Sequence, residues 1–389
     1  MSSPALVTAG PGNRTPAEVD ARLRRLVQRV SAPSRQHHVN LAVTSLDGQR
    51  RWFGGAGPAA GPAATDSDGT GPRELGPNSP FFTASITKRF IITLVLQAHE
   101  RGELDLDAPI TAYLPASITT GLHVRGRVDR TPEITVRHLA SHTSGLPDFF
   151  ERRRGGPSLY RRLRAGDDQA WGFDDVLEIT RAQQHPHFDP QDLAARRQKA
   201  QYSDTGFQLL IRILEHVTST PFADLLGTRI TEPLGLTRTW HPSTRPADQS
   251  APAPWPLYVG RRPVSLPATM AASHDLFSTT ADLIAFERAL TAGEPFHDPE
   301  TRHLLTERRN RLRNAPVLGY GLGTMFFTVN RLMLPKVGPV TLVGHSGSTG
   351  TWLFTCPELG VHLAGTVDQT QAQSLPFRIM ARCLQIWTR

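Results

Sequence analysis

The sequence predicts an α+β fold in which one antiparallel sheet is assembled from both ends of the chain and flanked by helices. Alternating apolar residues and turn motifs, which are typical of strands, occur near the start of the chain and again after residue 340. Residues 103–300 show mostly helical periodicity, interrupted by Pro and Gly, and predict a mainly helical lobe. Apolar residues cover almost the whole circumference of segment 86–100, which indicates a helix buried between two layers.

The N-terminal elements are predicted from capping and turn motifs. TPAE at residues 15–18 is a capping box with Pro16 at the first helical position, so a helix is expected to about Val30. Residues 39–43 then alternate apolar and polar, and Asp47-Gly48 supplies a hairpin turn to a second strand.

The remaining elements follow from periodicity. Further helices are predicted at 206–217 and 280–292, and a last helix at 375–387. Turn-rich segments separate three C-terminal strands, at 341–346, 351–355 and 361–367.

A chain of 389 residues exceeds the size at which a single hydrophobic core stops growing. We therefore expect two structural units behind a disordered tail at residues 1–14. Residues 15–110 and 300–389 are predicted to form the sheet domain, and residues 111–299 the mainly helical domain.

Composition excludes several classes of protein. The chain is 39% hydrophobic and 20% charged with a net charge of +8, which is ordinary for a folded globular protein. Cys356 and Cys383 lack metal-ligand spacing, so free thiols and no metal or other cofactor are expected. No segment resembles a membrane span or a secretory signal, which predicts a cytoplasmic protein without a membrane partner. The arginine clusters at 151–164 and 302–313 favour solvated helix faces over a nucleic-acid site.

One stretch suggests catalysis. In FFTASITKRF, residues 81–90, Ser85 precedes Lys88 by three positions at the predicted start of a helix. Residues i and i+3 share a helical face, so the lysine amine is expected to reach the serine hydroxyl and to accept its proton. The stretch by itself equally fits a capped helix with a lysine that extends to solvent.

Two later stretches favour the catalytic interpretation. QYSDTGFQLL (201–210) contains Tyr202 and Asp204 just before a helix, and VGHSGSTG (343–350) places His345 on a predicted strand. With these motifs in this order, the chain resembles the serine β-lactamase and penicillin-binding-protein superfamily, most closely its class C β-lactamase-like branch of esterases, D-aminopeptidases and acyltransferases. Five further stretches are similar to that family: ERGELDLDAPITAYLP (100–115), ITVRHLASHTSGLPDF (134–149), ITEPLGLTRTW (230–240), FSTTADLIAF (277–286) and GYGLGTMF (319–326).

The resemblance implies a β-lactamase/transpeptidase-like fold and a role for each motif residue. Ser85 would be the acylated nucleophile, Lys88 its base partner, and Tyr202 the general acid/base. His345 would hold the Tyr202 hydroxyl or a substrate carboxylate.

The strand motif is expected to bind the substrate. The backbone N–H groups of Ser85 and Ser348 would form the oxyanion hole. Ser346, Gly347 and Asp204 would contact the substrate. Asp204 departs from the family pattern, which has asparagine, and its carboxylate is expected to raise the pKa of Lys88 and to shift the base role towards Tyr202.

The predicted function is that of a serine hydrolase or acyltransferase. It would form an acyl-enzyme at Ser85 from a small-molecule ester or amide and pass the acyl group to water, an amine or an alcohol. A catalytically silent ligand-binding homologue of the same fold is the alternative. The sequence does not predict an oligomeric state.

Overall fold

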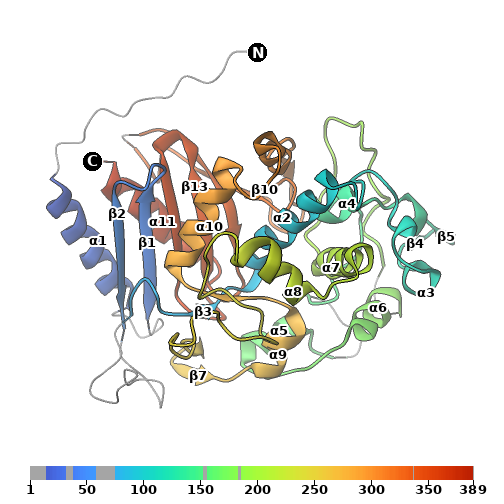
Figure 1. Cartoon of the computed structure of the whole chain (residues 1–389), viewed down its shortest axis with the longest axis horizontal. Coiled ribbons are helices and arrows are strands. Elements are labelled where there is room, and N and C mark those ends of the chain that lie inside the picture. Colours follow the sequence, from blue (N-terminus) through green and yellow to red (C-terminus); the bar gives the residue numbers. More distant parts are fainter. Residues whose placement is uncertain are drawn as a thin grey trace.

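The computed structural model describes residues 15–31, 38–57, 75–151, 156–182, 185–335 and 337–388. The tail expected at residues 1–14 lies outside this part of the chain. Figure 1 shows the sheet at one end of the molecule and a group of shorter helices at the other. The α+β class predicted from the sequence is confirmed.

The main sheet joins the two ends of the chain. Its eight strands run in the order β2-β1-β14-β13-β12-β11-β10-β9, and all neighbours are antiparallel. β1 pairs with β14, so the N-terminal hairpin is an integral part of the C-terminal sheet. The strands are β1 Val39–Ser45, β2 Arg51–Ala56, β9 Asn310–Arg311, β10 Leu318–Tyr320, β11 Met325–Val329, β12 Val340–Ser346, β13 Thr351–Cys356 and β14 Val361–Thr366.

Two terminal helices cover the outer face of the sheet. α1 (Pro16–Ser31) begins with the expected capping box, in which the Glu18 amide donates to Thr15 Oγ1 at 3.3 Å and the Thr15 amide donates to Glu18 Oε2 at 2.9 Å. α11 (Leu375–Trp387) packs beside α1, and both contribute to a core cluster with the outward residues of β1 and β14. Cys356 and Cys383 are buried in this layer as free thiols.

Two longer helices cover the inner face. α10 (Thr280–Ala292) lies against β1, β13 and β14, and α2 (Thr87–Glu100) runs between the sheet and the helical lobe. Every residue of α2 from Thr87 to Ala98 is buried, as its circumferential hydrophobicity predicts. An ion pair joins the two helices, in which Arg89 Nη2 donates to both carboxylate oxygens of Glu287, at 3.0 and 3.2 Å. Thr87 and Arg89, the residues on either side of Lys88, are thus buried in the core.

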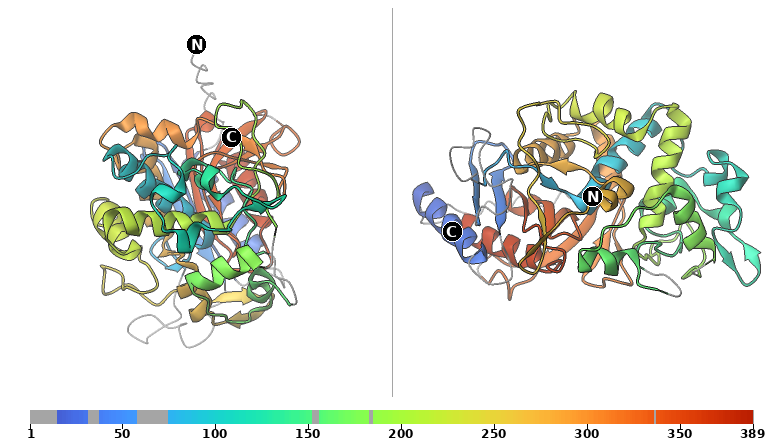
Figure 2. Two further views of the ribbon diagram at one scale, coloured as in Figure 1. Left: turned by 90° about the vertical axis from the view of Figure 1, so that its right-hand side faces the viewer. Right: turned by 90° about the horizontal axis from the view of Figure 1, so that it is seen from below.

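The helical lobe lies on the far side of α2 (Figure 2). α7 (Asp204–Thr218) packs against α2 and α4, and it brings residues of the lobe towards the start of α2. The division at residues 110 and 300 stays a prediction, and α10, which falls inside the range assigned to the lobe, packs on the sheet. The other helical elements are η1 Ala84–Ile86, η2 Ile110–Ala112, α3 Ala116–Thr119, η3 Thr131–Glu133, α4 Val136–Ala140, α5 Leu159–Ala165, α6 Phe173–Ala182, α8 Phe222–Leu226, η4 Gly227–Thr231, α9 Pro267–Ser273, η5 Pro299–Leu305 and η6 Pro357–Leu359.

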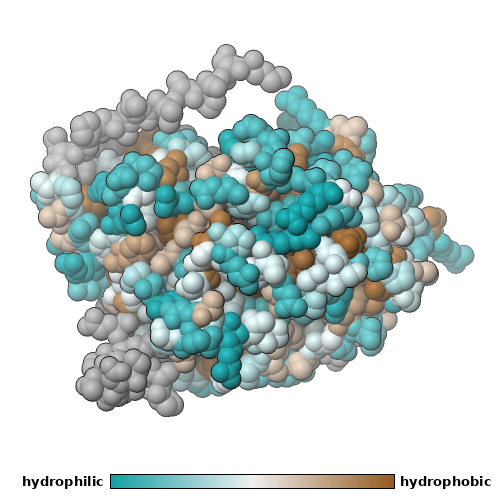
Figure 3. Space-filling model, viewed as in Figure 1, coloured by the Kyte–Doolittle hydropathy of each residue, from teal (hydrophilic) through white to brown (hydrophobic). Residues whose placement is uncertain are grey.

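Three two-stranded ribbons complete the fold: β3 (Phe81–Phe82) with β8 (Phe277–Ser278), β4 (Val124–Arg125) with β5 (Val128–Asp129), and β6 (Leu257–Val259) with β7 (Arg262–Val264). Hydrophilic and hydrophobic side chains are interspersed over the face seen in Figure 3. Within the described residues, no helix combines the length and the apolar character needed to cross a membrane.

Candidate active site

Ser85 lies in a strained turn that leads into α2. The turn η1 follows strand β3, and Ala84, directly before the serine, has φ of 49°, which non-glycine residues seldom adopt. The side chain of Thr351 donates to the Thr83 carbonyl at 2.8 Å and so ties this turn to the sheet. Such strain persists where the surrounding structure over-determines it, and it is common at functional sites.

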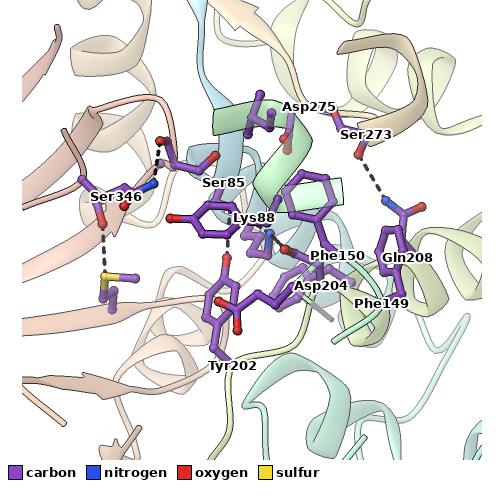
Figure 4. A pocket seen from close by; sticks show the side chains of 18 of the residues that line it. Ser85, Lys88, Phe149, Phe150, Tyr202, Asp204, Gln208, Ser273, Asp275 and Ser346 are labelled. Atoms are coloured by element: carbon purple, nitrogen blue, oxygen red, sulfur yellow. Dashed lines mark hydrogen bonds and ion pairs between the residues drawn. The ribbon is translucent and has the colours of Figure 1, made fainter. Parts of the chain in front are cut away.

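The Ser85 hydroxyl accepts two hydrogen bonds, one from a residue three positions away and one from a residue far away in the sequence. Lys88 Nζ donates to Ser85 Oγ at 3.2 Å, and the Tyr202 hydroxyl donates to the same oxygen at 3.0 Å. Figure 4 shows the three side chains converging in the pocket. The structure therefore brings together the three residues that the S-x-x-K and Tyr-Ser-Asp motifs indicate.

Lys88 forms an ion pair with Asp204. Its Nζ lies 2.5 Å from Asp204 Oδ1, and the lysine side chain is only 6% exposed. Burial alone would lower the pKa of Lys88, but the carboxylates of Asp204 and Asp275 outweigh it, so the pKa lies above its ordinary value. This direction agrees with the effect expected of Asp204 on the lysine, and it favours the ammonium form of Lys88 at neutral pH.

Tyr202 also keeps its proton. Burial and the nearby Asp204 carboxylate raise the pKa of Tyr202 well above its usual value. Its ring packs on that of His142 with centroids 4.4 Å apart, and His142 Nδ1 accepts the Ser203 amide at 3.3 Å. His142 thus fixes the segment that carries Tyr202, a role that its position in SHTSGL did not reveal. The structure does not favour a shift of the base role to Tyr202.

His345 differs from expectation. Its Nε2 accepts the Tyr320 hydroxyl at 2.9 Å and its Nδ1 donates to the Ser346 carbonyl at 2.8 Å, so both ring nitrogens are occupied. Burial and the charge of Lys88 hold the pKa of His345 well below its usual value, and the ring is neutral. The hydroxyl that His345 holds is therefore that of Tyr320 and not, as expected, that of Tyr202, whereas its contact with a substrate carboxylate stays a prediction.

The strand motif approaches the serine turn closely at Gly347. A Cβ on Gly347 would lie 2.1 Å from Thr351 Oγ1 and 2.8 Å from the Thr83 carbonyl oxygen, so only glycine fits there. Ser346, Gly347 and Ser348 all line the same cavity as Ser85. The two residues expected to form the oxyanion hole, Ser85 and Ser348, thus line the same cavity.

This cavity has a volume of about 370 Å³, and Ser85 is among the residues that line it (Figure 4). One wall is aromatic: the rings of Phe149, Phe150 and Trp171 lie within 6.1 Å of one another, and Tyr160 is next to Phe150. The wall comes from residues 149–171, a segment in which the sequence analysis found basic clusters instead of a binding surface.

Asp275 is a further lining residue that the sequence analysis did not find. Burial raises its pKa to about 6, although Lys88 opposes the shift. The Asp275 amide donates to Ser273 Oγ at 3.1 Å, and the amide of the next residue, Leu276, donates to Thr87 Oγ1 at 3.0 Å. Thr87 belongs to the turn of α2 that carries Ser85 and Lys88, so the segment that carries Asp275 is held beside that turn. Its neighbours in sequence form no motif, and tertiary structure alone places it here.

The antiparallel sheet and the buried α2 are together typical of the β-lactamase fold, and the Ser-Lys-Tyr cluster lies at the junction of its two parts. A model of the Beta-lactamase family matches residues 20–381, and the chain belongs to this family. The resemblance noted in the sequence is confirmed.

Several known proteins are similar to this chain. Esterase EstB of Burkholderia gladioli is 30% identical over 173 residues, which cover 42% of this chain and 39% of the esterase, so the match spans less than half of either protein. AmpH of Escherichia coli K12, a D-alanyl-D-alanine-carboxypeptidase/endopeptidase, is 23% identical over 72% of this chain and 68% of its own. The solved structure of a D-stereospecific amidohydrolase from Streptomyces sp. superimposes with a TM-score of 0.69 at 25% identity, covering 93% of this chain and 97% of that one.

Proposed function

We propose that this protein forms an acyl-enzyme at Ser85 from a small-molecule ester or amide and passes the acyl group to water or to an amine or alcohol. The observation that carries this proposal is the position of Ser85 Oγ, 3.2 Å from Lys88 Nζ and 3.0 Å from the Tyr202 hydroxyl, in a cavity. The esterase and amidohydrolase relatives support the same substrate class.

In the first step Ser85 Oγ attacks the substrate carbonyl carbon, and its proton passes to the neutral form of Lys88. This form is a minor species at neutral pH, because Asp204 and Asp275 stabilise the ammonium. The backbone N–H groups of Ser85 and Ser348 would stabilise the oxyanion that forms, a contribution typically worth about 10²- to 10³-fold in rate per donor.

In the second step the bond from the carbonyl carbon to the leaving group breaks, and the Tyr202 hydroxyl gives its proton to the departing atom. Lys88 returns a proton to Tyr202. Water, an amine or an alcohol then attacks the acyl carbon, and its proton passes to Lys88, directly or as Tyr202 accepts it and gives its own proton to Lys88. Lys88 returns this proton to Ser85 Oγ as the ester bond to Ser85 breaks.

The experiment is steady-state kinetics with a panel of p-nitrophenyl esters, comparing the wild type, Ser85→Ala and the exposed-serine control Ser117→Ala. We expect Ser85→Ala to lose at least about 10³-fold in kcat/KM, whereas Ser117→Ala keeps the wild-type rate. Equal activity of Ser85→Ala and the wild type overturns the proposal. Amines and alcohols added to the reaction then divide the products between hydrolysis and acyl transfer.

A catalytically silent binding protein is the second candidate. The Lys88–Asp204 ion pair favours it, because a lysine held as an ammonium is a poor base. This candidate predicts that Ser85→Ala changes no reaction and that small ligands still occupy the cavity.

A further inference from the structure

We propose that His38 and Asp368 form a buried positioning pair that holds the loop of Ser348 in the geometry of the oxyanion hole. Neither residue lines the cavity, so the pair would act through the backbone and not by touching the substrate. This inference rests on the proposed function and adds to it two residues that lie outside the sequence motifs. It comes from a chain of hydrogen bonds between the pair and residues 348–350.

The pair extends the ladder between β1 and β14. Asn40 is paired with Thr366 at the end of this ladder, and His38 and Asp368 lie two positions beyond them. His38 Nε2 donates to Asp368 Oδ2, and both side chains are fully shielded from solvent. The Thr366 hydroxyl donates to the other carboxylate oxygen at 2.7 Å. Removing the histidine donor would therefore leave a buried oxygen of Asp368 without this partner, which is costly.

Asp368 lies at the point where the chain leaves the sheet. Its φ of 44° is in the left-handed region, which Asp adopts more readily than most non-glycine residues. The Asp368 amide donates to Thr366 Oγ1 at 2.9 Å, so the backbone and the side chain of this residue are both held. The direction in which residues 369–373 leave β14 therefore depends on the hydrogen bonds of Asp368.

The segment 367–373 in turn holds the loop of Ser348. All three carbonyl groups of residues 348–350 accept hydrogen bonds from this segment. The Gln373 side chain donates to the Ser348 carbonyl at 3.3 Å, the Gln369 amide to the Thr349 carbonyl at 2.8 Å, and the Val367 amide to the Gly350 carbonyl at 3.1 Å. Because the amide of Ser348 belongs to the same short loop, its direction depends on the position of this segment.

His38 also contacts the segment that leads to Ser85. Its ring packs against that of Trp255, with centroids 5.3 Å apart. The Trp255 amide donates to the Pro80 carbonyl at 2.9 Å, and Pro80 directly precedes β3, the strand before the turn of Ser85. The pair thus connects the two backbone segments whose amides, those of Ser85 and Ser348, are expected to stabilise the oxyanion.

Loss of the pair should weaken the oxyanion hole and leave the lining of the cavity in place. A donor in such a hole acts when it lies within about 3 Å of the oxygen on which charge develops, and it is typically worth about 10²- to 10³-fold in rate. A displaced Ser348 amide should cost part of this factor. A substrate with sulfur in place of the carbonyl oxygen should lose less, because sulfur is a weak hydrogen-bond acceptor.

The test compares kcat/KM for a p-nitrophenyl ester and for its thiono analogue, in which sulfur replaces the carbonyl oxygen. His38→Phe keeps an aromatic ring and removes the donor, whereas His38→Gln keeps an amide donor near the position of Nε2. We expect His38→Phe to lose at least about tenfold with the ester and under about threefold with the thiono analogue, and His38→Gln to regain most of the loss.

His362→Phe is the matched control. His362 is a buried histidine of β14, and its Nδ1 is hydrogen-bonded to the Thr355 hydroxyl at 2.8 Å. Its replacement should lower the melting temperature and affect the ester and the thiono analogue equally, because it makes no hydrogen bond to residues 348–350 among the described contacts.

Three results overturn the inference: His38→Phe stays within about twofold of the wild type with the ester, it loses equally with both substrates, or a folded His38→Gln is no better than His38→Phe. If His38→Phe does not fold by circular dichroism, Asp368→Asn takes its place, since its side chain accepts through one oxygen only. Failure of the proposed function would look different, because Ser85→Ala would then turn over the ester as fast as the wild type.

Discussion

Lys88 Nζ lies 2.5 Å from Asp204 Oδ1, closer than the 3.2 Å that separates it from Ser85 Oγ. The amine that is best placed to accept the serine proton is therefore held in its charged form. Tyr202 also retains its proton, so the resting site contains two donors that both point at the nucleophile. If Lys88 is the base, acylation is expected to become faster as the pH rises towards the raised pKa of Lys88.

Asp204→Asn should move the pH profile of acylation to lower pH. The substitution removes the carboxylate that raises the pKa of Lys88, while burial continues to lower it, so neutral lysine appears at lower pH. We expect a shift of at least about one unit, which is about tenfold in the acylation rate at neutral pH. The measurement is the rate of inactivation by a fluorophosphonate between about pH 6 and 10.

Asp167→Asn is the matched control for that experiment and should reproduce the wild-type profile. A loss of reactivity at every pH in Asp204→Asn would contradict the account, because it would mean that the carboxylate itself takes part in the reaction.

Tyr202→Phe should lower kcat by about 10²- to 10⁴-fold, the usual contribution of a positioned general acid/base. The ring would still pack on His142, so the melting temperature should change little. Tyr113→Phe serves as the control, since its hydroxyl accepts the Asp105 amide away from the cavity. A Tyr202→Phe enzyme within about threefold of the wild type would exclude Tyr202 from proton transfer.

Tyr320→Phe should destabilise the fold by about 1–3 kcal/mol, because it leaves the fully buried Nε2 of His345 without its donor. Urea unfolding measures the change. Tyr113→Phe should cost less, since solvent can reach the partly exposed site of that hydroxyl. An unchanged unfolding free energy in Tyr320→Phe would show that His345 has a different partner.

Asp275→Asn should stabilise the protein at neutral pH. The folded-state pKa of about 6 lies above the ordinary value of 3.8 for an aspartate, so the folded protein binds a proton between about pH 4 and 6 that the unfolded chain has released. Ionised Asp275 thus disfavours the fold above pH 6, by about 2 kcal/mol and at most about 3. Thermal melts should show the gain at about pH 7.5 and its loss near pH 4; equal gains at both values would contradict this origin.

Local patterns predicted much of the fold. The helix expected at 375–387 corresponds to α11, and that at 280–292 to α10, because both amphipathic repeats and their ends are written in contiguous residues. The contact between Ser85 and Lys88 could also be predicted from the sequence, since it depends on one helical turn. The effect of Asp204 on Lys88 could be predicted only from the resemblance to a known family, because the two residues are over a hundred positions apart in the sequence.

The lining of the cavity around Ser85, in contrast, could not be predicted from local sequence patterns. The segment that carries Asp275 is held by the hydrogen bond from the Leu276 amide to Thr87 Oγ1, and the ring of Phe150 lies 5.7 Å from that of Trp171. Neither contact has a sequence period or a fixed spacing. His345 was assigned to substrate or Tyr202 because the motif shows its residue type, whereas Tyr320, which occupies its Nε2, belongs to another strand.

The proposed mechanism depends on one step, the acylation of Ser85 Oγ by the substrate. Intact-protein mass spectrometry after brief exposure to a p-nitrophenyl ester, a chromogenic cephalosporin or a fluorophosphonate, with peptide mapping of any adduct, tests it most directly. The account predicts a single adduct on Ser85 in the wild type and none in Ser85→Ala. An unlabelled but folded wild type, or equal labelling of Ser85→Ala, would contradict it.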